Sequence, residues 1–75
     1  MKEINNERDL VEAVIRDKEQ GTYYIAKYII KKLNITNTED FNHVSVKVET
    51  QRILKQYVSD QIKTKIINKI KHMPN

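Results

Sequence analysis

The basic residues of the last 27 positions are the side chains that most clearly suggest a chemistry. Residues 49–75 carry six basic side chains and only two acidic ones, Glu49 and Asp60. The basic residues are Arg52, Lys55, Lys63, Lys65, Lys69 and Lys71. Such a surplus of positive charge attracts phosphate groups regardless of base sequence, and it attracts acidic proteins as well. Together with Lys47, these residues are the candidates for contacts with nucleic-acid phosphates.

Other chemistries lack the residues that they need. The two histidines, His43 and His72, lie far apart and have no second ligand at helical spacing, so we expect no metal and no other cofactor. A single glycine excludes a glycine-rich phosphate loop, and no carboxylate is paired with a histidine in a catalytic arrangement. We therefore expect a protein that is not an enzyme and has no small-molecule substrate.

Length and composition predict one small domain spanning residues 1–75. A chain of this size buries only roughly 60% of its unfolded surface, and the absence of cysteine excludes disulfides, so oligomerisation is the remaining common source of stability. No apolar run approaches the roughly 20 residues that cross a bilayer, and the polar N-terminus does not resemble a signal peptide. We expect a cytoplasmic protein without membrane contact.

Hydrophobic periodicity predicts a mainly α-helical fold. Its three principal helices are expected at about 6–19, 22–33 and 50–72, with a polar link at 34–43. Asn5 or Asn6 is placed to cap the first helix, Gly21 is typical of its C-terminus, and Asn34 is typical of the end of the second. The low glycine and proline counts also favour helices over a fold of many strands.

A short β segment is predicted near 44–48. Val44, Val46 and Val48 alternate with polar residues, and β-branched residues at this density favour a strand. Its partner would be Ile35-Thr36 or a second copy of the chain. Two fold analogies follow, namely a winged-helix-like domain and a ribbon-helix-helix-like dimer in which Lys47 faces the bases.

The apolar face of the last predicted helix changes direction along its length. On a helical wheel Ile53, Leu54, Tyr57 and Val58 point one way, and the apolar residues after Ser59 point roughly half a turn away. Either the helix ends near Ser59, which can cap a new helix, or one long helix packs its first half on its own domain and its second half on another molecule.

The second apolar set is our candidate interface with a second copy or another partner. It consists of Ile62, Ile66, Ile70 and Met73. On a monomer such a patch is rarely left exposed, and its spacing suits helix packing in a symmetric dimer. The alternative is that it covers the first helix of its own chain.

These features together predict a small non-enzymatic DNA-binding regulator of the phage or mobile-element type, acting as a homodimer. The alternative is a protein-binding module that inhibits or adapts a larger host protein through a helix face. Because an acidic protein and DNA both attract lysines, the sequence leaves the two open.

Overall fold

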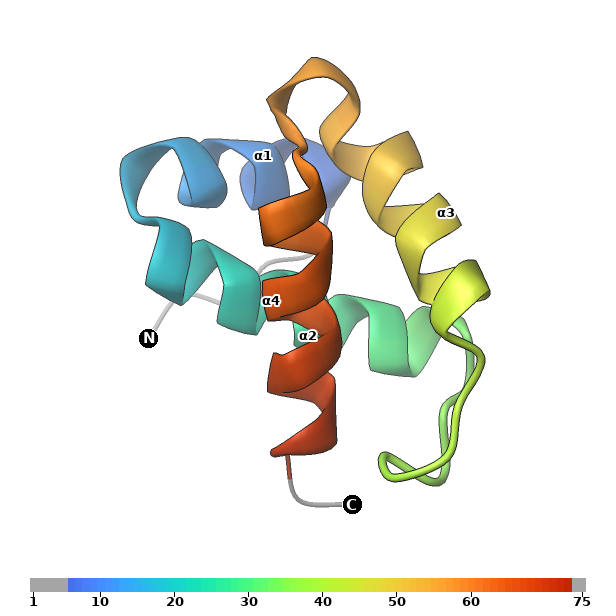
Figure 1. Ribbon diagram of the computed structural model, residues 1–75. Coiled ribbons are helices and arrows are strands. Elements are labelled where there is room, and N and C mark those ends of the chain that lie inside the picture. The colour runs from blue at the N-terminus through green and yellow to red at the C-terminus, as the bar shows by residue number, and fades with distance from the viewer. Residues whose placement is uncertain (1–5, 74–75) are drawn as a thin grey trace.

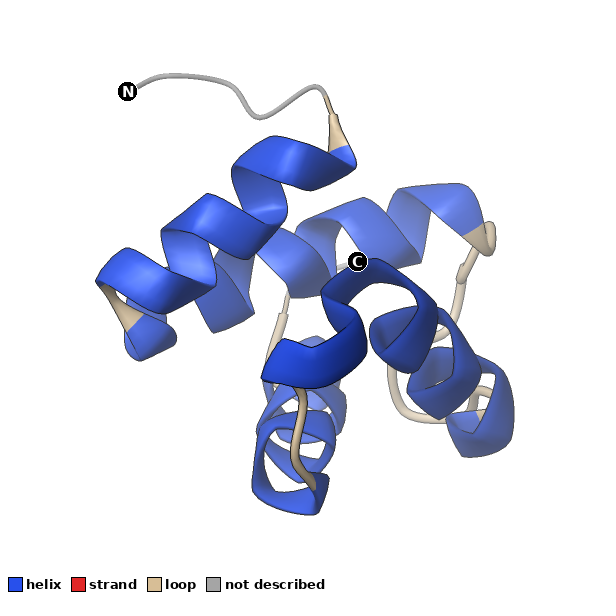
Figure 2. Ribbon diagram, turned by 90° about the horizontal axis from the view of Figure 1, so that it is seen from above, coloured by secondary structure: helices blue, strands red, loops and turns tan. Residues whose placement is uncertain are grey.

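The computed structural model describes residues 6–73, which form four α-helices and one 3-10 helix. The elements are α1 (Glu7–Arg16), α2 (Lys18–Lys32), α3 (His43–Leu54), η1 (Lys55–Tyr57) and α4 (Asp60–Lys71). In Figure 1, α4 crosses in front of α2, with α1 and α3 on either side. The mainly helical fold is confirmed, but the described range has four helices where three principal ones were predicted, and Figure 2 shows no strand in it.

The boundary between α1 and α2 lies at Asp17. Asn6 caps α1 by accepting a hydrogen bond from the Asp9 backbone N–H at 2.9 Å, as predicted. Asp17 has an extended backbone, and its carboxylate accepts the backbone N–H groups of Glu19 and Gln20 at 3.1 and 3.4 Å. One residue therefore ends α1 and caps α2, so the break comes earlier than the one expected at Gly21.

Gly21 is buried inside α2, where it lies against the backbone of Val14 in α1. A Cβ atom at this position would lie 2.5 Å from the Cα of Val14 and 2.6 Å from its backbone nitrogen. Backbone atoms cannot move aside as a flexible side chain can. The only glycine of the chain is therefore explained by helix packing and not by a turn.

Asn34 ends α2, as the sequence predicts. Its φ of 54° is left-handed, a conformation that asparagine adopts more readily than most residues. The Asn34 N–H donates to the Lys31 carbonyl, and the Ile35 N–H donates to the Ile30 carbonyl at 2.9 Å. These two bonds form a Schellman motif, which satisfies carbonyls that the helix end would otherwise leave unpaired.

The prediction of a β segment at 44–48 is wrong, because these residues lie in α3. The Asn42 side chain caps the helix by accepting the Ser45 backbone N–H at 3.1 Å. Only the middle valine of the alternating pattern, Val46, is buried, whereas Val44 and Val48 are exposed. Burial instead follows helical spacing, since Val46 is followed by buried Thr50 and then by Ile53 and Leu54. Without this strand the winged-helix-like and ribbon-helix-helix-like analogies lose their basis.

The helix predicted at 50–72 is interrupted between Leu54 and Asp60, which explains why its apolar face changes direction. Lys55 has a φ of 52°, on the left-handed side that few non-glycine residues adopt, and it begins the short η1. Ser59 caps α4 by accepting the Ile62 backbone N–H at 3.3 Å. Two helices separated by a turn can each direct an apolar face towards the same core.

One hydrophobic core receives residues from all four α-helices. Its buried members are Leu10, Val14, Ile25, Ala26, Ile29, Val46, Ile53, Leu54, Ile62, Ile66, Ile67 and Ile70. The described part measures 29 × 27 × 18 Å along its principal axes. Among residues 6–73, no helix has the length and apolar character to cross a membrane.

Candidate nucleic-acid interface

The polar face of α4 gathers three of the seven predicted phosphate-binding residues, namely Lys65, Lys69 and Lys71. It consists of Gln61, Thr64, Lys65, Asn68, Lys69, Lys71 and His72. These positions recur at helical spacing on the side of α4 opposite its buried isoleucines. Six of the seven are exposed and Lys69 is half-buried. The face contains no carboxylate, because the only acidic residue of α4 is Asp60 in its first turn.

A shallow groove separates one edge of this face from α2. It is lined by Glu19 and Thr22 of α2 together with Lys65, Asn68, Lys69 and His72. Glu19 reduces the positive potential at this edge, since unlike charges in proximity partly cancel. Of the three lysines on the face, Lys71 is the one that does not line this groove.

Lys63 lies outside the polar face of α4. Its half-buried side chain lies, by helical spacing, on the side of α4 that carries the buried isoleucines, and its Nζ lies 3.9 Å from a carboxylate oxygen of Asp60. Charge alone groups Lys63 with the other lysines in the sequence. The direction of its side chain separates it from Lys65, Lys69 and Lys71.

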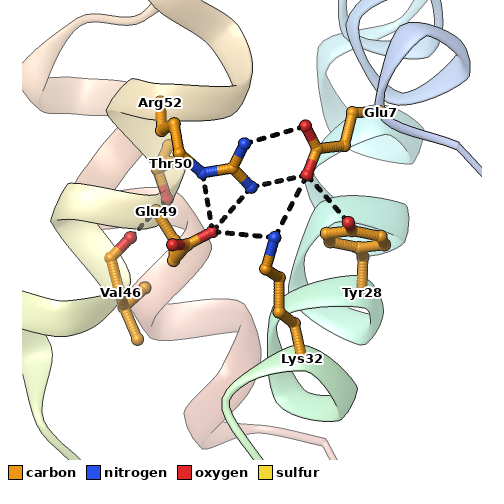
Figure 3. A network of polar contacts seen from close by, with 7 residues as sticks. All are labelled: Glu7, Tyr28, Lys32, Val46, Glu49, Thr50 and Arg52. Atoms are coloured by element: carbon orange, nitrogen blue, oxygen red, sulfur yellow. Dashed lines mark hydrogen bonds and ion pairs between the residues drawn. The ribbon is translucent and has the colours of Figure 1, made fainter.

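Arg52 belongs to a network of polar contacts within the domain (Figure 3). Its guanidinium donates to both carboxylate oxygens of Glu7, with Nη1 at 3.0 Å from Oε1, and to Glu49 with Nη2 at 2.9 Å. The Lys32 ammonium lies 3.4 Å from Glu7 and 3.7 Å from Glu49. The Tyr28 hydroxyl donates to Glu7 at 2.8 Å. Because two carboxylates already neutralise Arg52, it is a poor phosphate ligand in this conformation.

The network also shifts the pKa values of its members. The hydrogen bonds from Arg52, and then that from Tyr28, lower the pKa of Glu7 from 4.5 to about 2. The Arg52 hydrogen bond also lowers the pKa of Glu49, and donation to Glu7 raises the pKa of Tyr28. Both carboxylates are therefore ionised at neutral pH, so the contacts between α1, α2 and α3 are charge-assisted.

The remaining candidates, Lys47 and Lys55, lie on the exposed side of α3 and at its end. The same side of α3 carries Gln51 and two exposed valines, Val44 at 68% and Val48 at 60% exposure. It is thus more apolar than the polar face of α4. Sequence reasoning missed this surface because it assigned the valines to a strand.

The candidate interface at Ile62, Ile66, Ile70 and Met73 is not an exposed patch. The three isoleucines are buried in the core of the single chain, and Met73 is partly buried against it. The set therefore covers its own domain, but α4 packs mainly on α2 and not on the first helix, which the alternative had named. Because a new helix begins after Ser59, these residues turn towards the core of their own chain and are not exposed to a second copy.

Four residues of the α4 face, Gln61, Thr64, Asn68 and His72, were absent from the predicted site. Their helical spacing relative to Lys65 and Lys71 was readable in the sequence, but charge alone does not select them. Over residues 6–73, no group of three or more histidine, cysteine or acidic side chains is placed to hold a metal ion. No protein-family model, curated protein or solved structure matches this chain.

Proposed function

We propose that this chain is a small, non-enzymatic DNA-binding regulator that contacts DNA through the polar face of α4. The observation that carries the proposal is the composition of that face, where lysines stand among neutral hydrogen-bonding side chains with no carboxylate. Lysine ammonium groups neutralise phosphates and release counterions. Gln61 and Asn68 have the amide groups that read adenine edges in a major groove, and Thr64 has a hydroxyl.

The order of elements gives a second reason. The helices α3 and α4 are joined by residues 55–59, so the pair has the order helix, turn, helix. In DNA-binding motifs of that order the second helix lies in the major groove and its exposed residues contact base edges. This connection is slightly longer than the three or four residues usual for such a turn. The helix expected to face DNA is α4.

Fluorescence anisotropy with a labelled random-sequence DNA duplex tests the proposal. The double variant Lys65→Ala, Lys71→Ala should bind at least about tenfold more weakly than the wild type at low salt. The plot of log affinity against log salt should also become shallower, by about one for each phosphate that the variant leaves unneutralised. Both residues are exposed, so the variant should fold normally.

The matched control is Lys27→Ala, Lys31→Ala, which removes the same charge from the exposed side of α2. By helical spacing, Lys31 lies on the side of α2 opposite Thr22, which lines the groove with α4. The control should retain nearly wild-type affinity. Equal losses in both double variants would mean that only net charge matters, and absence of wild-type binding at low salt would reject DNA binding.

A protein-binding module is the second candidate, and the exposed valines of α3 favour it. Val44 and Val48 lie one turn apart, which is the spacing of anchors in helix-mediated contacts. Polar substitution of both valines should leave DNA affinity unchanged if α4 alone contacts DNA. A chain that does not bind DNA and becomes more soluble in the Val44→Ser, Val48→Ser variant would favour the second candidate.

A further inference from the structure

The outward face of α1 is not covered by any other part of residues 6–73. The helix packs on α2 and α3 through Leu10, Ala13 and Val14, all of which are buried. Arg8, Glu12 and Ile15 lie on the opposite side, at the spacing i, i+4, i+7. Ile15 is 61% exposed, which makes it the most exposed large apolar residue outside α3 in the range 6–73.

The charges on this face form no ion pair within residues 6–73. Arg8 and Glu12 are four positions apart on one helix, the spacing at which an ion pair commonly forms. Neither of them forms a salt bridge there, whereas Glu7 in the adjacent position is fully engaged with Arg52 and Lys32. One positive and one negative side chain are therefore available on a surface that also carries an exposed isoleucine.

A groove lies beside the N-terminal half of this face, between α1 and η1. Its apolar floor is formed by Val11, Ile53 and Leu54, and its rim includes Arg8, Lys55 and Tyr57. Tyr57 is one of the exposed large apolar residues, with 46% exposure. The groove thus offers an apolar surface of the kind that an exposed isoleucine can fill.

We propose that a second copy of this chain covers this surface, with the two α1 helices packed antiparallel about a twofold axis. A twofold interface uses the same patch twice, so a patch that holds both charges can be self-complementary. Arg8 of each copy then pairs with Glu12 of the other. Ile15 lies one turn beyond Glu12, so it reaches the groove at the N-terminal end of the other copy's α1. A 75-residue chain without disulfides gains additional core from such pairing.

Sedimentation equilibrium over a concentration series tests the arrangement by charge exchange. Arg8→Glu alone and Glu12→Arg alone should each raise the dimer dissociation constant by about tenfold or more, because each places like charges opposite one another. The double variant Arg8→Glu, Glu12→Arg restores opposite charges at both contacts. Its dissociation constant should return to within about threefold of the wild-type value.

Surface controls carry the same charge changes elsewhere. Lys31→Glu on α2 matches the first single variant, and Glu39→Arg in the link between α2 and α3 matches the second; both positions are exposed. Neither should alter the dissociation constant, and circular dichroism verifies that every variant is folded. A wild type that stays monomeric, or single variants that dimerise as well as the wild type, would overturn the proposal. So would a double variant that is not restored. The polar face of α4 takes no part in this contact, so a failure of DNA binding leaves the result unaffected.

Discussion

Glu7 connects three helices through one carboxylate. It stands in the first turn of α1, and it accepts hydrogen bonds from Tyr28 of α2 and Arg52 of α3. A carboxylate in the first turn of a helix also interacts favourably with the helix dipole. The tertiary contacts instead make it the centre of a network in which Arg52 is held within the domain.

Replacing Glu7 by glutamine should change how stability depends on pH. The folded-state pKa of about 2 lies below the ordinary value of 4.5, so the carboxylate stabilises the fold above pH 4.5 and loses this effect as pH falls towards 2. Because the side chain is 33% exposed, solvent screening reduces the effect, and we expect Glu7→Gln to lose about 1 kcal/mol at pH 7.

Urea unfolding followed by circular dichroism at pH 7, 4 and 2 measures this difference. The free energies of wild type and Glu7→Gln should converge as the pH approaches 2. Glu39→Gln is the control, since Glu39 is exposed and its side chain forms no ion pair in the described range. A constant difference at all three pH values would contradict the role assigned to Glu7.

At the scale of elements, the crossing of α1 and α2 depends on Gly21. The two helices are separated by Asp17 alone, so they must turn back sharply and approach closely. The close approach is possible because position 21 has no Cβ. An exposed helix position would favour alanine over glycine by about 1 kcal/mol, so retaining glycine inside α2 reflects packing and not propensity.

Gly21→Ala should destabilise the domain although alanine favours helices. The added methyl group would meet the backbone of Val14, and overpacking of this kind costs about 1–3 kcal/mol. Thermal unfolding measures the loss. Gln20→Ala, at the exposed neighbouring position, should be neutral or slightly stabilising. A more stable Gly21→Ala variant would show that the two helices separate easily.

The whole molecule is organised around one core that α4 completes. Ile62, Ile66 and Ile70 pack within the chain, so α4 has a buried apolar face and, opposite it, an exposed polar face. The proposed interfaces accordingly occupy different elements, with DNA on α4 and a second copy on α1. A small domain can carry both because the proposed DNA contact uses a polar face with lysines, whereas the proposed contact between copies uses an exposed isoleucine and one charge of each sign.

Ile66→Ala should act on folding and not on association. Ile66 is fully buried, and truncation of such a residue costs about 2–5 kcal/mol, a large part of the stability of a domain this size. Urea unfolding at two protein concentrations should give the same loss at both. Thr64→Ala, exposed on the same helix, is the control. A loss that disappears at high protein concentration would instead place Ile66 in an interface.

The sequence alone determined the helical character of the chain, a cap at Asn5 or Asn6, the end of α2 at Asn34 and the basic character of α4. Each of these depends on local physics, because capping and periodicity act within a few residues. The helix at 43–54, the packing role of Gly21, the burial of Ile66 and the network around Arg52 were decided by tertiary structure. In these cases a residue's environment is formed by segments distant in sequence. Of the three alternating valines only Val46 is buried, and Arg52 is held by Glu7, which lies 45 positions earlier in the chain. The positions of the charged residues could therefore be read from the sequence, but the surface or partner that each side chain faces could not.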